Sequence, residues 1–341
     1  MLTLTNEMAE RGLAIDLVLA RAEGPFLAQV HEDVRVVDLG SGHVAKSLPR
    51  LTRYLRRERP HALLSSLNYV NIIAVIACVL ARVPTRVILG EHSTPSQDRP
   101  AGLRNRVVRH LMPLLYPRAD LVVAVSEGVA DDLSRTINLA RERIRVIYNP
   151  VVRPEILVKA AASPDHPWFR EGEPPVVLGI GRLTEAKDFR TLIRAVACLR
   201  KHRNVRLIIL GEGVLREALE AQVAELGVSD HVALPGFVDN PYSYIRRSAV
   251  FALSSRWEGL PTVLIEAMAC GTSVVSTDCP SGPREILGNG VWGKLVPVGD
   301  ATAIAEAIDE TLDERSSPEV AVRAADFSVE KAATSYIDAL T

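Results

Sequence analysis

Short apolar segments alternate with longer segments of helical spacing, and this alternation restricts the fold more than any other feature. Apolar runs bounded by turn residues are typical of strands buried in a parallel sheet. The helical segments between them supply the crossovers that parallel strands require. The predicted strands are 14–20, 34–39, 62–65, 86–89, 121–125 and 143–147, then 176–180, 205–210, 249–253, 273–276 and 291–296.

A proline-rich segment interrupts the alternation near the middle of the chain. Six prolines lie between residues 150 and 175, as is typical of a linker. A chain of 341 residues is long for one hydrophobic core. We therefore predict two doubly wound, Rossmann-like α/β domains, 1–150 and 151–341, that face each other across a cleft. The first begins with a helical pattern at 2–12, so its usual first strand is predicted to be missing.

Composition excludes several classes of function. The net charge is −1 and only 5% of the residues are aromatic, which argues against nucleic-acid binding. The four cysteines and eight histidines show no metal-site or disulfide spacing, so no metal site is expected. No apolar segment is long enough to span a membrane, and the N-terminus lacks a signal-peptide profile. A cytoplasmic protein with free thiols is the expectation.

Residues 250–271 have the pattern of a phosphate-binding helix start. An apolar strand ends in two serines, and a loop then leads into a helix predicted to begin at Pro261. Proline suits the first helical position because its missing N–H has no partner there in any case. The first turn presents unpaired N–H groups and the positive end of the helix dipole, which favour a phosphate.

Two glutamates flank this helix start. Glu258 lies in the loop before the helix, and Glu266 lies within it on an otherwise apolar face. A buried carboxylate needs a polar partner. A ribose diol and an arginine salt bridge would each supply one, and the spacing leaves both interpretations open.

Two glycine turns, 179–181 and 211–213, each follow a strand and precede a helix. Neither has the third glycine of a dinucleotide fingerprint, which argues against an NAD(P) site. A phosphate turn is one interpretation, with Gly181 allowing close approach and with Arg182 and Lys187 supplying cations. An ordinary loop with solvated cations is the other.

Two features of the first half have a functional and a plain interpretation. His92 follows a predicted strand, at the edge where ligands bind in open α/β sheets, but it also fits a polar loop. Residues 99–118 carry five arginines, no acid and an apolar stripe. Such a basic amphipathic helix lies on an anionic membrane surface or packs on its own sheet.

The second half contains a series of motifs in a fixed order: Gly181-Arg182-Leu183 with Lys187, Gly211-Glu212-Gly213, Leu234-Pro235-Gly236-Phe237-Val238, Ser255 to Pro261 with Glu266 and Gly271, and Ser281 to Glu285. In their order and spacing these motifs resemble those of the retaining glycosyltransferases of family 4, which have the GT-B fold and build bacterial lipopolysaccharide, capsule and glycolipids. The first half resembles the family more loosely, at 125–128, at 147–150 and around His92.

The resemblance implies a role for each motif. The cations and the helix start would hold a diphosphate, Glu266 the ribose, the backbone at 237–238 the base, and Glu258 the donor sugar. Family members of this fold work without a bound metal or other cofactor. The implied donor-binding residues are Gly181, Arg182, Lys187, Phe237, Val238, Gly259, Leu260, Pro261, Thr262 and Glu266, and the implied catalytic residues are Glu258 and His92.

The resulting prediction is a hexosyl or N-acetylhexosaminyl transferase. It would move a sugar, with retention, from a UDP- or GDP-sugar to a hydroxyl of a lipid-linked glycan or polysaccharide precursor, at the inner face of the plasma membrane. The missing first strand would remove a glycine-rich loop that the resemblance places beside the donor phosphates. An N-terminally truncated, inactive nucleotide-sugar-binding protein is therefore one alternative, and a nucleotide-sugar epimerase of the same fold is another.

Overall fold

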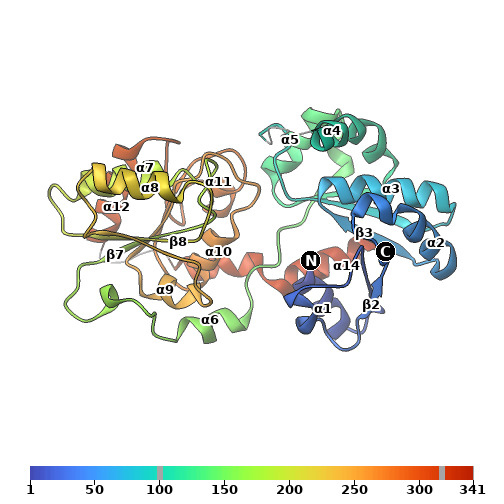
Figure 1. The fold of residues 1–341 in the computed structure, drawn as a ribbon, viewed down its shortest axis with the longest axis horizontal. Coiled ribbons are helices and arrows are strands. Elements are labelled where there is room, and N and C mark those ends of the chain that lie inside the picture. Colours follow the sequence, from blue (N-terminus) through green and yellow to red (C-terminus); the bar gives the residue numbers. More distant parts are fainter. Residues whose placement is uncertain (98–102, 315–318, 341) are drawn as a thin grey trace. The chain divides into compact units, whose positions relative to one another are not determined.

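The computed structural model describes residues 1–97, 103–314 and 319–340 and divides the chain into two compact units (Figure 1). Unit 1 comprises residues 1–150 and 329–341, and unit 2 comprises 151–328. The division after Pro150 lies where the prolines begin, as predicted. The assignment of the C-terminus to the second domain was wrong, because α14 (Val329–Leu340) packs in unit 1.

Unit 1 contains two parallel sheets. The predicted strands of the first half are all present, with shifts of a few residues at their ends. The first element is a helix, α1 (Leu2–Glu10), as the sequence indicated. One sheet pairs β1 (Asp16–Leu19) with β2 (Arg35–Asp38), and the other contains, in this order, β3 (Ala62–Ser66), β4 (Arg86–Glu91), β5 (Leu121–Ala124) and β6 (Ile144–Val146).

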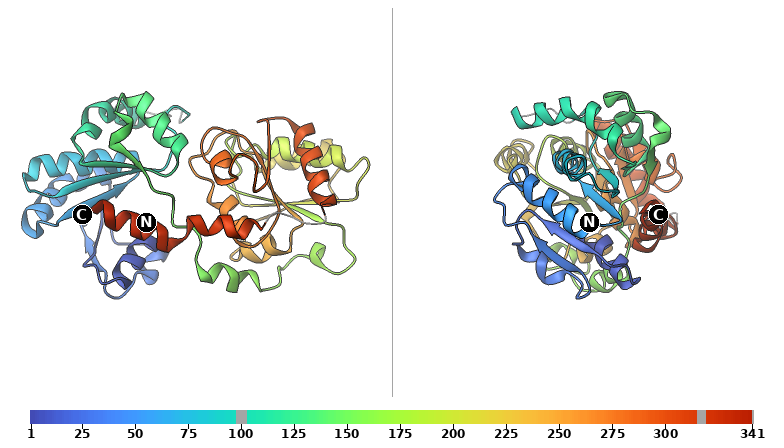
Figure 2. Two further views of the ribbon diagram at one scale, coloured as in Figure 1. Left: turned by 180° about the vertical axis from the view of Figure 1, so that it is seen from behind. Right: turned by 90° about the vertical axis from the view of Figure 1, so that its right-hand side faces the viewer.

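Helices α1 and α14 lie side by side in unit 1 (Figure 2). Leu4 and Met8 of α1 and Tyr336 of α14 share one apolar cluster with Ile88 and Val123 of the four-stranded sheet. This shared core joins the last helix to unit 1, although 178 residues of unit 2 separate it from Pro150. The other helices of unit 1 are α2 (Leu48–Glu58), α3 (Asn68–Ala81), α4 (Leu103–Leu115) and α5 (Glu127–Ile137).

Unit 2 is a doubly wound domain with one parallel sheet of six strands, in the order β12-β11-β10-β7-β8-β9. The strand order therefore reverses between β7 and β10, which creates a topological switch point. The unpredicted strand β9 contains Pro235, and a proline is tolerated there because β9 is an edge strand. The strands are β7 (Val176–Ile180), β8 (Arg206–Leu210), β9 (Val232–Gly236), β10 (Val250–Leu253), β11 (Val274–Thr277) and β12 (Lys294–Val296).

Helices cover both faces of this sheet. In Figure 1, α7, α8 and α12 lie on one side of the strands, and α9 and α10 lie on the other. No helix in the described part of the chain is long and apolar enough to cross a membrane. The helices of unit 2 are α6 (Pro154–Ala160), α7 (Phe189–Leu199), α8 (Arg216–Glu225), α9 (Pro241–Arg247), α10 (Thr262–Ala269), α11 (Pro283–Ile286), α12 (Ala301–Asp313) and α13 (Val320–Ala324).

Candidate active site

The switch point of unit 2 brings together two charged residues that the sequence separates by 71 positions. Lys187 follows β7, and Glu258 follows β10. The Lys187 ammonium nitrogen lies 2.5 Å from Oε1 of Glu258, and both side chains are largely buried. The two residues predicted to hold the donor's diphosphate and its sugar therefore form an ion pair with each other.

The helix start predicted to bind phosphate is present beside this pair. Helix α10 begins at Thr262, and no side chain caps it. Pro261 is its N-cap residue rather than its first helical residue, a small correction that leaves the first-turn N–H groups in place. The loop after β11 packs closely here, because a Cβ at Gly282 would come within 2.5 Å of Cδ of Pro261.

The two glycine turns contact one another. A Cβ at Gly211 would overlap the carbonyl oxygen of Gly181, and a Cβ at Gly213 would overlap the backbone of Leu183. Glycines 211 and 213 are therefore required by backbone packing, a role that the sequence analysis did not assign. Gly181 instead faces the aliphatic part of the Lys187 side chain.

A hollow of about 360 Å³ opens beside these turns. It brings together the residues predicted for the phosphates and for the base, from β7 and from the loop after β9. Phe237 is 78% exposed, so its ring is available to a ligand. The lining residues are Ile180, Gly181, Arg182, Leu210, Gly211, Glu212, Phe237, Val238 and Pro241.

Glu266 is largely buried in α10, where it accepts a hydrogen bond of 3.3 Å from the Tyr242 hydroxyl. Burial raises the pKa of the Glu266 carboxyl to about 7, although the Tyr242 hydrogen bond and the charge of Arg153 both lower it. The Tyr242 hydroxyl is thus a protein partner of this carboxylate that the sequence did not indicate.

Replacing Glu266 with Gln should stabilise the protein at pH 8 and change little at pH 5. The folded-state pKa of about 7 exceeds the ordinary 4.5, so the folded protein binds more protons between these values and its free energy of unfolding falls as pH rises. Glutamine removes that loss, roughly 1–3 kcal/mol. Melting temperatures at both pH values, with the exposed Glu225→Gln as control, test this. A stabilisation of equal size at pH 5 and pH 8 contradicts it.

His92 lies in unit 1, directly after β4. Its Nε2 is 3.3 Å from the Ser66 hydroxyl. Burial lowers the pKa of the His92 imidazole, and a hydrogen bond with Asn149 partly opposes this effect. The preceding residue, Glu91, was not singled out from sequence. It is 1% exposed and accepts a 2.9 Å hydrogen bond from the Tyr116 hydroxyl.

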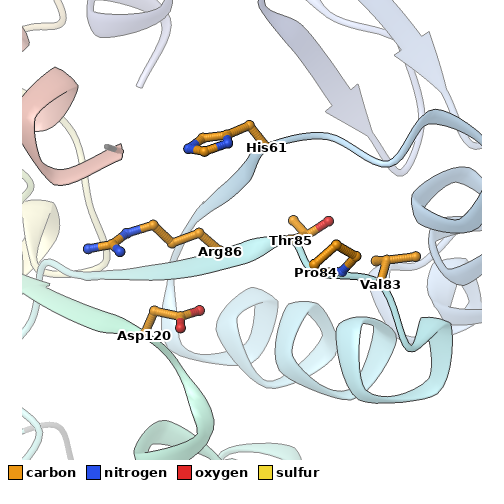
Figure 3. Close-up of a pocket in the computed structure, with 6 residues that line it drawn as sticks. All are labelled: His61, Val83, Pro84, Thr85, Arg86 and Asp120. Carbon is orange, nitrogen blue, oxygen red and sulfur yellow. The ribbon is translucent and has the colours of Figure 1, made fainter.

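A second hollow, of about 430 Å³, lies in unit 1 at the opposite, amino-terminal edge of the four-stranded sheet (Figure 3). Its basic side chains contact the C-terminal end of α14. Nε2 of His61 is 3.1 Å from the Leu340 carbonyl oxygen, and Arg86 donates to that of Ala339 at 3.0 Å. Since none of the predicted site residues lies there, we assign this hollow to the anchoring of α14.

The basic segment 99–118 is only partly described, since residues 98–102 lie outside the described chain. Val108 and Met112 of α4 are buried, whereas Val107 and Leu114 are 48% and 60% exposed. The apolar stripe is thus divided between the interior and the surface.

Among the residues that the structure describes, no group of three or more His, Cys, Asp or Glu side chains is placed to hold a metal ion.

Comparison with known proteins bears on the family and the fold. Residues 1–153 match the family model Glycosyltransferase Family 4, and residues 165–326 match Glycosyl transferases group 1. The chain belongs to the family 4 glycosyltransferases. In fold it resembles a glycosyltransferase of Rickettsia africae (TM-score 0.81, 15% identity, 99% of this chain and 92% of that one). It also resembles Anabaena HepE in complex with UDP-glucose (TM-score 0.78, 20% identity, 99% and 94%). These likenesses show the GT-B fold.

Curated relatives are more similar in sequence. One is the N-acetylgalactosamine-N,N'-diacetylbacillosaminyl-diphospho-undecaprenol 4-alpha-N-acetylgalactosaminyltransferase of Campylobacter jejuni, 35% identical over 73% of this chain and 66% of that protein. Another is a lipopolysaccharide core biosynthesis glycosyltransferase of Rhizobium meliloti, 35% identical over 59% and 56%. The chain thus spans less than two thirds of the length of these relatives.

Proposed function

We propose that this family 4 member is a retaining glycosyltransferase that moves a hexosyl or N-acetylhexosaminyl group from a UDP- or GDP-sugar to a hydroxyl of a lipid-linked glycan or polysaccharide precursor. The observation that carries the proposal is the Lys187–Glu258 pair beside the start of α10. A cation, a carboxylate and a helix start meet there at the switch point of a doubly wound sheet, where such folds bind ligands.

The proposed mechanism assigns separate tasks to these groups. As the bond between the sugar and the diphosphate breaks, negative charge develops on the diphosphate. Arg182, Lys187 and the α10 dipole would stabilise that charge. Glu258 would lie on the face of the sugar opposite the diphosphate, either as nucleophile or holding the sugar's hydroxyls while the acceptor oxygen attacks on the diphosphate's side. The acceptor oxygen gains the sugar, and its proton passes to the departing diphosphate or to the solvent.

The comparisons support the classes of donor and acceptor. The HepE structure is titled as a complex with UDP-glucose. The C. jejuni relative is named for an undecaprenol-diphosphate-linked glycan, and the R. meliloti relative for the lipopolysaccharide core. We therefore propose that the donor of this chain is a nucleoside diphosphate-sugar and that its acceptor is lipid-linked, at the cytoplasmic face of the membrane.

A donor panel tests the proposal. UDP- and GDP-linked hexoses and N-acetylhexosamines would be incubated with the protein and undecaprenyl-diphosphate-linked glycans, and release of nucleoside diphosphate would be measured with and without acceptor. We expect release with one donor, faster with acceptor. Conversion of a donor alone into its epimer, seen by NMR, would indicate the epimerase instead. Nucleotide binding without release would indicate an inactive binding protein.

We also propose that α4 contacts an anionic membrane surface. Arg106 and Arg109 are exposed on α4 together with Val107 and Leu114. Each basic residue near an anionic bilayer contributes on the order of 1 kcal/mol. The double variant Arg106→Glu/Arg109→Glu should therefore lose most of its co-sedimentation with phosphatidylglycerol vesicles at low salt, while Arg247→Glu in unit 2 should not. Equal sedimentation of the two variants contradicts this assignment.

A further inference from the structure

The two serines that follow β10 contact the two charged residues of the proposed site. Ser254 and Ser255 are 1% and 0% exposed. The Ser254 hydroxyl donates to the backbone carbonyl of Lys187 at 2.8 Å, and the Ser255 hydroxyl donates to Oε1 of Glu258 at 2.6 Å. Adjacent residues thus hold opposite members of one ion pair, one through the backbone and the other through the carboxylate.

The backbone of Ser255 is anchored to the sheet. Ser255 lies two residues after Leu253, which pairs with Ser276 of β11. The Ser255 carbonyl also accepts a 2.6 Å hydrogen bond from the Thr277 hydroxyl. Glu258, by contrast, lies in the irregular loop before α10. A buried hydroxyl just beyond the end of β10 therefore fixes one oxygen of a carboxylate that a loop carries.

The loop that carries Lys187 is tied to the same strand end. The Arg256 N–H donates to the Ala186 carbonyl at 2.7 Å, and Arg256 also pairs with the buried carboxylate of Asp188 at 3.1 Å. Together with the Ser254 bond, these contacts hold residues 186–188 against residues 254–256. These contacts therefore set the distance between the Lys187 and Glu258 side chains.

We propose that Ser255 is a positioning residue for sugar transfer, because it fixes the Glu258 carboxylate, and that Ser254 positions Lys187. The inference rests on the proposed function. A diphosphate that enters the site competes with Glu258 for the Lys187 ammonium. The Ser255 hydroxyl is uncharged, so the diphosphate does not draw it away from Oε1 of Glu258 as it draws the ammonium. The hydroxyl therefore holds the carboxylate in place when the nucleotide-sugar is bound.

Two alanine variants separate these roles by their kinetics. Ser255→Ala should lower kcat roughly 10- to 100-fold, because a displaced carboxylate loses interactions made in the transition state, while the Kd for the nucleoside diphosphate stays within about threefold. Ser254→Ala should mainly raise that Kd, by roughly tenfold, because it acts through the cation. Ser255→Thr keeps the hydroxyl and should recover most of the turnover.

Ser276→Ala is the matched control. Ser276 is 0% exposed in β11, and its hydroxyl donates within its own strand, to the Thr277 carbonyl at 2.9 Å. An unchanged kcat in Ser255→Ala, or an equal loss in Ser276→Ala, overturns the inference. Absence of nucleotide release by the wild-type protein with every donor would instead overturn the proposed function. In that event a crystal structure of Ser255→Ala decides: a shifted Glu258 carboxylate supports the positioning role, and an unshifted one overturns it.

Discussion

Glu258→Gln should lower kcat by about 10²–10³-fold and leave the affinity for the nucleoside diphosphate unchanged or slightly higher. The carboxylate is proposed to act on the sugar, so its loss removes an interaction made in the transition state. It also releases the Lys187 ammonium from its 2.5 Å ion pair, which leaves that cation for the diphosphate alone. Initial rates and titration calorimetry with UDP and GDP measure the two effects separately.

The control for this variant is Glu225→Gln, an exposed acid at the end of α8 in the same unit. It should leave both kcat and affinity unchanged. If Glu258→Gln keeps full turnover, or if it weakens nucleotide affinity as much as it lowers kcat, the assignment of Glu258 to the sugar is wrong.

Lys187→Ala should weaken nucleoside diphosphate binding by roughly 10- to 100-fold, the range of a hydrogen bond to a charged group of about 1.5–3 kcal/mol. The variant loses a cation at the diphosphate and also leaves Glu258 without that ion-pair partner, so the carboxylate repels the ligand. The affinity for the nucleoside without phosphates should hardly change. Calorimetry with UDP, GDP and the two nucleosides measures this difference.

Two comparisons make the test specific. Lys201→Ala removes an exposed lysine in the turn after α7 and should have no effect. In a Glu258→Gln background, Lys187→Ala should cost less affinity than in the wild-type protein, because the repelling carboxylate is gone. Equal weakening of nucleoside and nucleoside diphosphate would show that Lys187 does not contact the phosphates.

The fold was largely predictable, because buried strands and helical crossovers each have a recognisable local pattern of apolar residues in the sequence. The exceptions depend on tertiary contacts. The edge strand β9 was missed because Pro235 interrupts its pattern. Helix α14 was assigned to the wrong domain because tertiary packing against α1 and the four-stranded sheet places it in unit 1. The facing arrangement of the two domains across a cleft stays a prediction.

The sequence indicated candidate residues for the site, but it did not indicate their contacts. Motif order indicated Lys187 and Glu258, yet no spacing rule shows that residues so far apart form an ion pair. Ser255 was noted at the end of a predicted strand and as the first residue of a family motif, but not as a partner of Glu258, since a serine carries no signal of what its hydroxyl contacts. For the turn at Gly211 and Gly213 the sequence left a phosphate turn and an ordinary loop open, and close contacts with neighbouring backbone explain both glycines. The roles of the donor-binding residues and of His92 stay predictions.

Thermal unfolding in the presence of nucleotides tests the central claim most directly, since that claim is a nucleoside diphosphate site in unit 2. At 100 times its Kd, a ligand of the folded state adds roughly 2.7 kcal/mol to the free energy of unfolding. The account predicts that UDP or GDP raises the melting temperature accordingly, that the matching nucleoside raises it far less, and that Lys187→Ala removes most of the difference. An unchanged melting temperature with every nucleoside diphosphate at millimolar concentration would contradict the account.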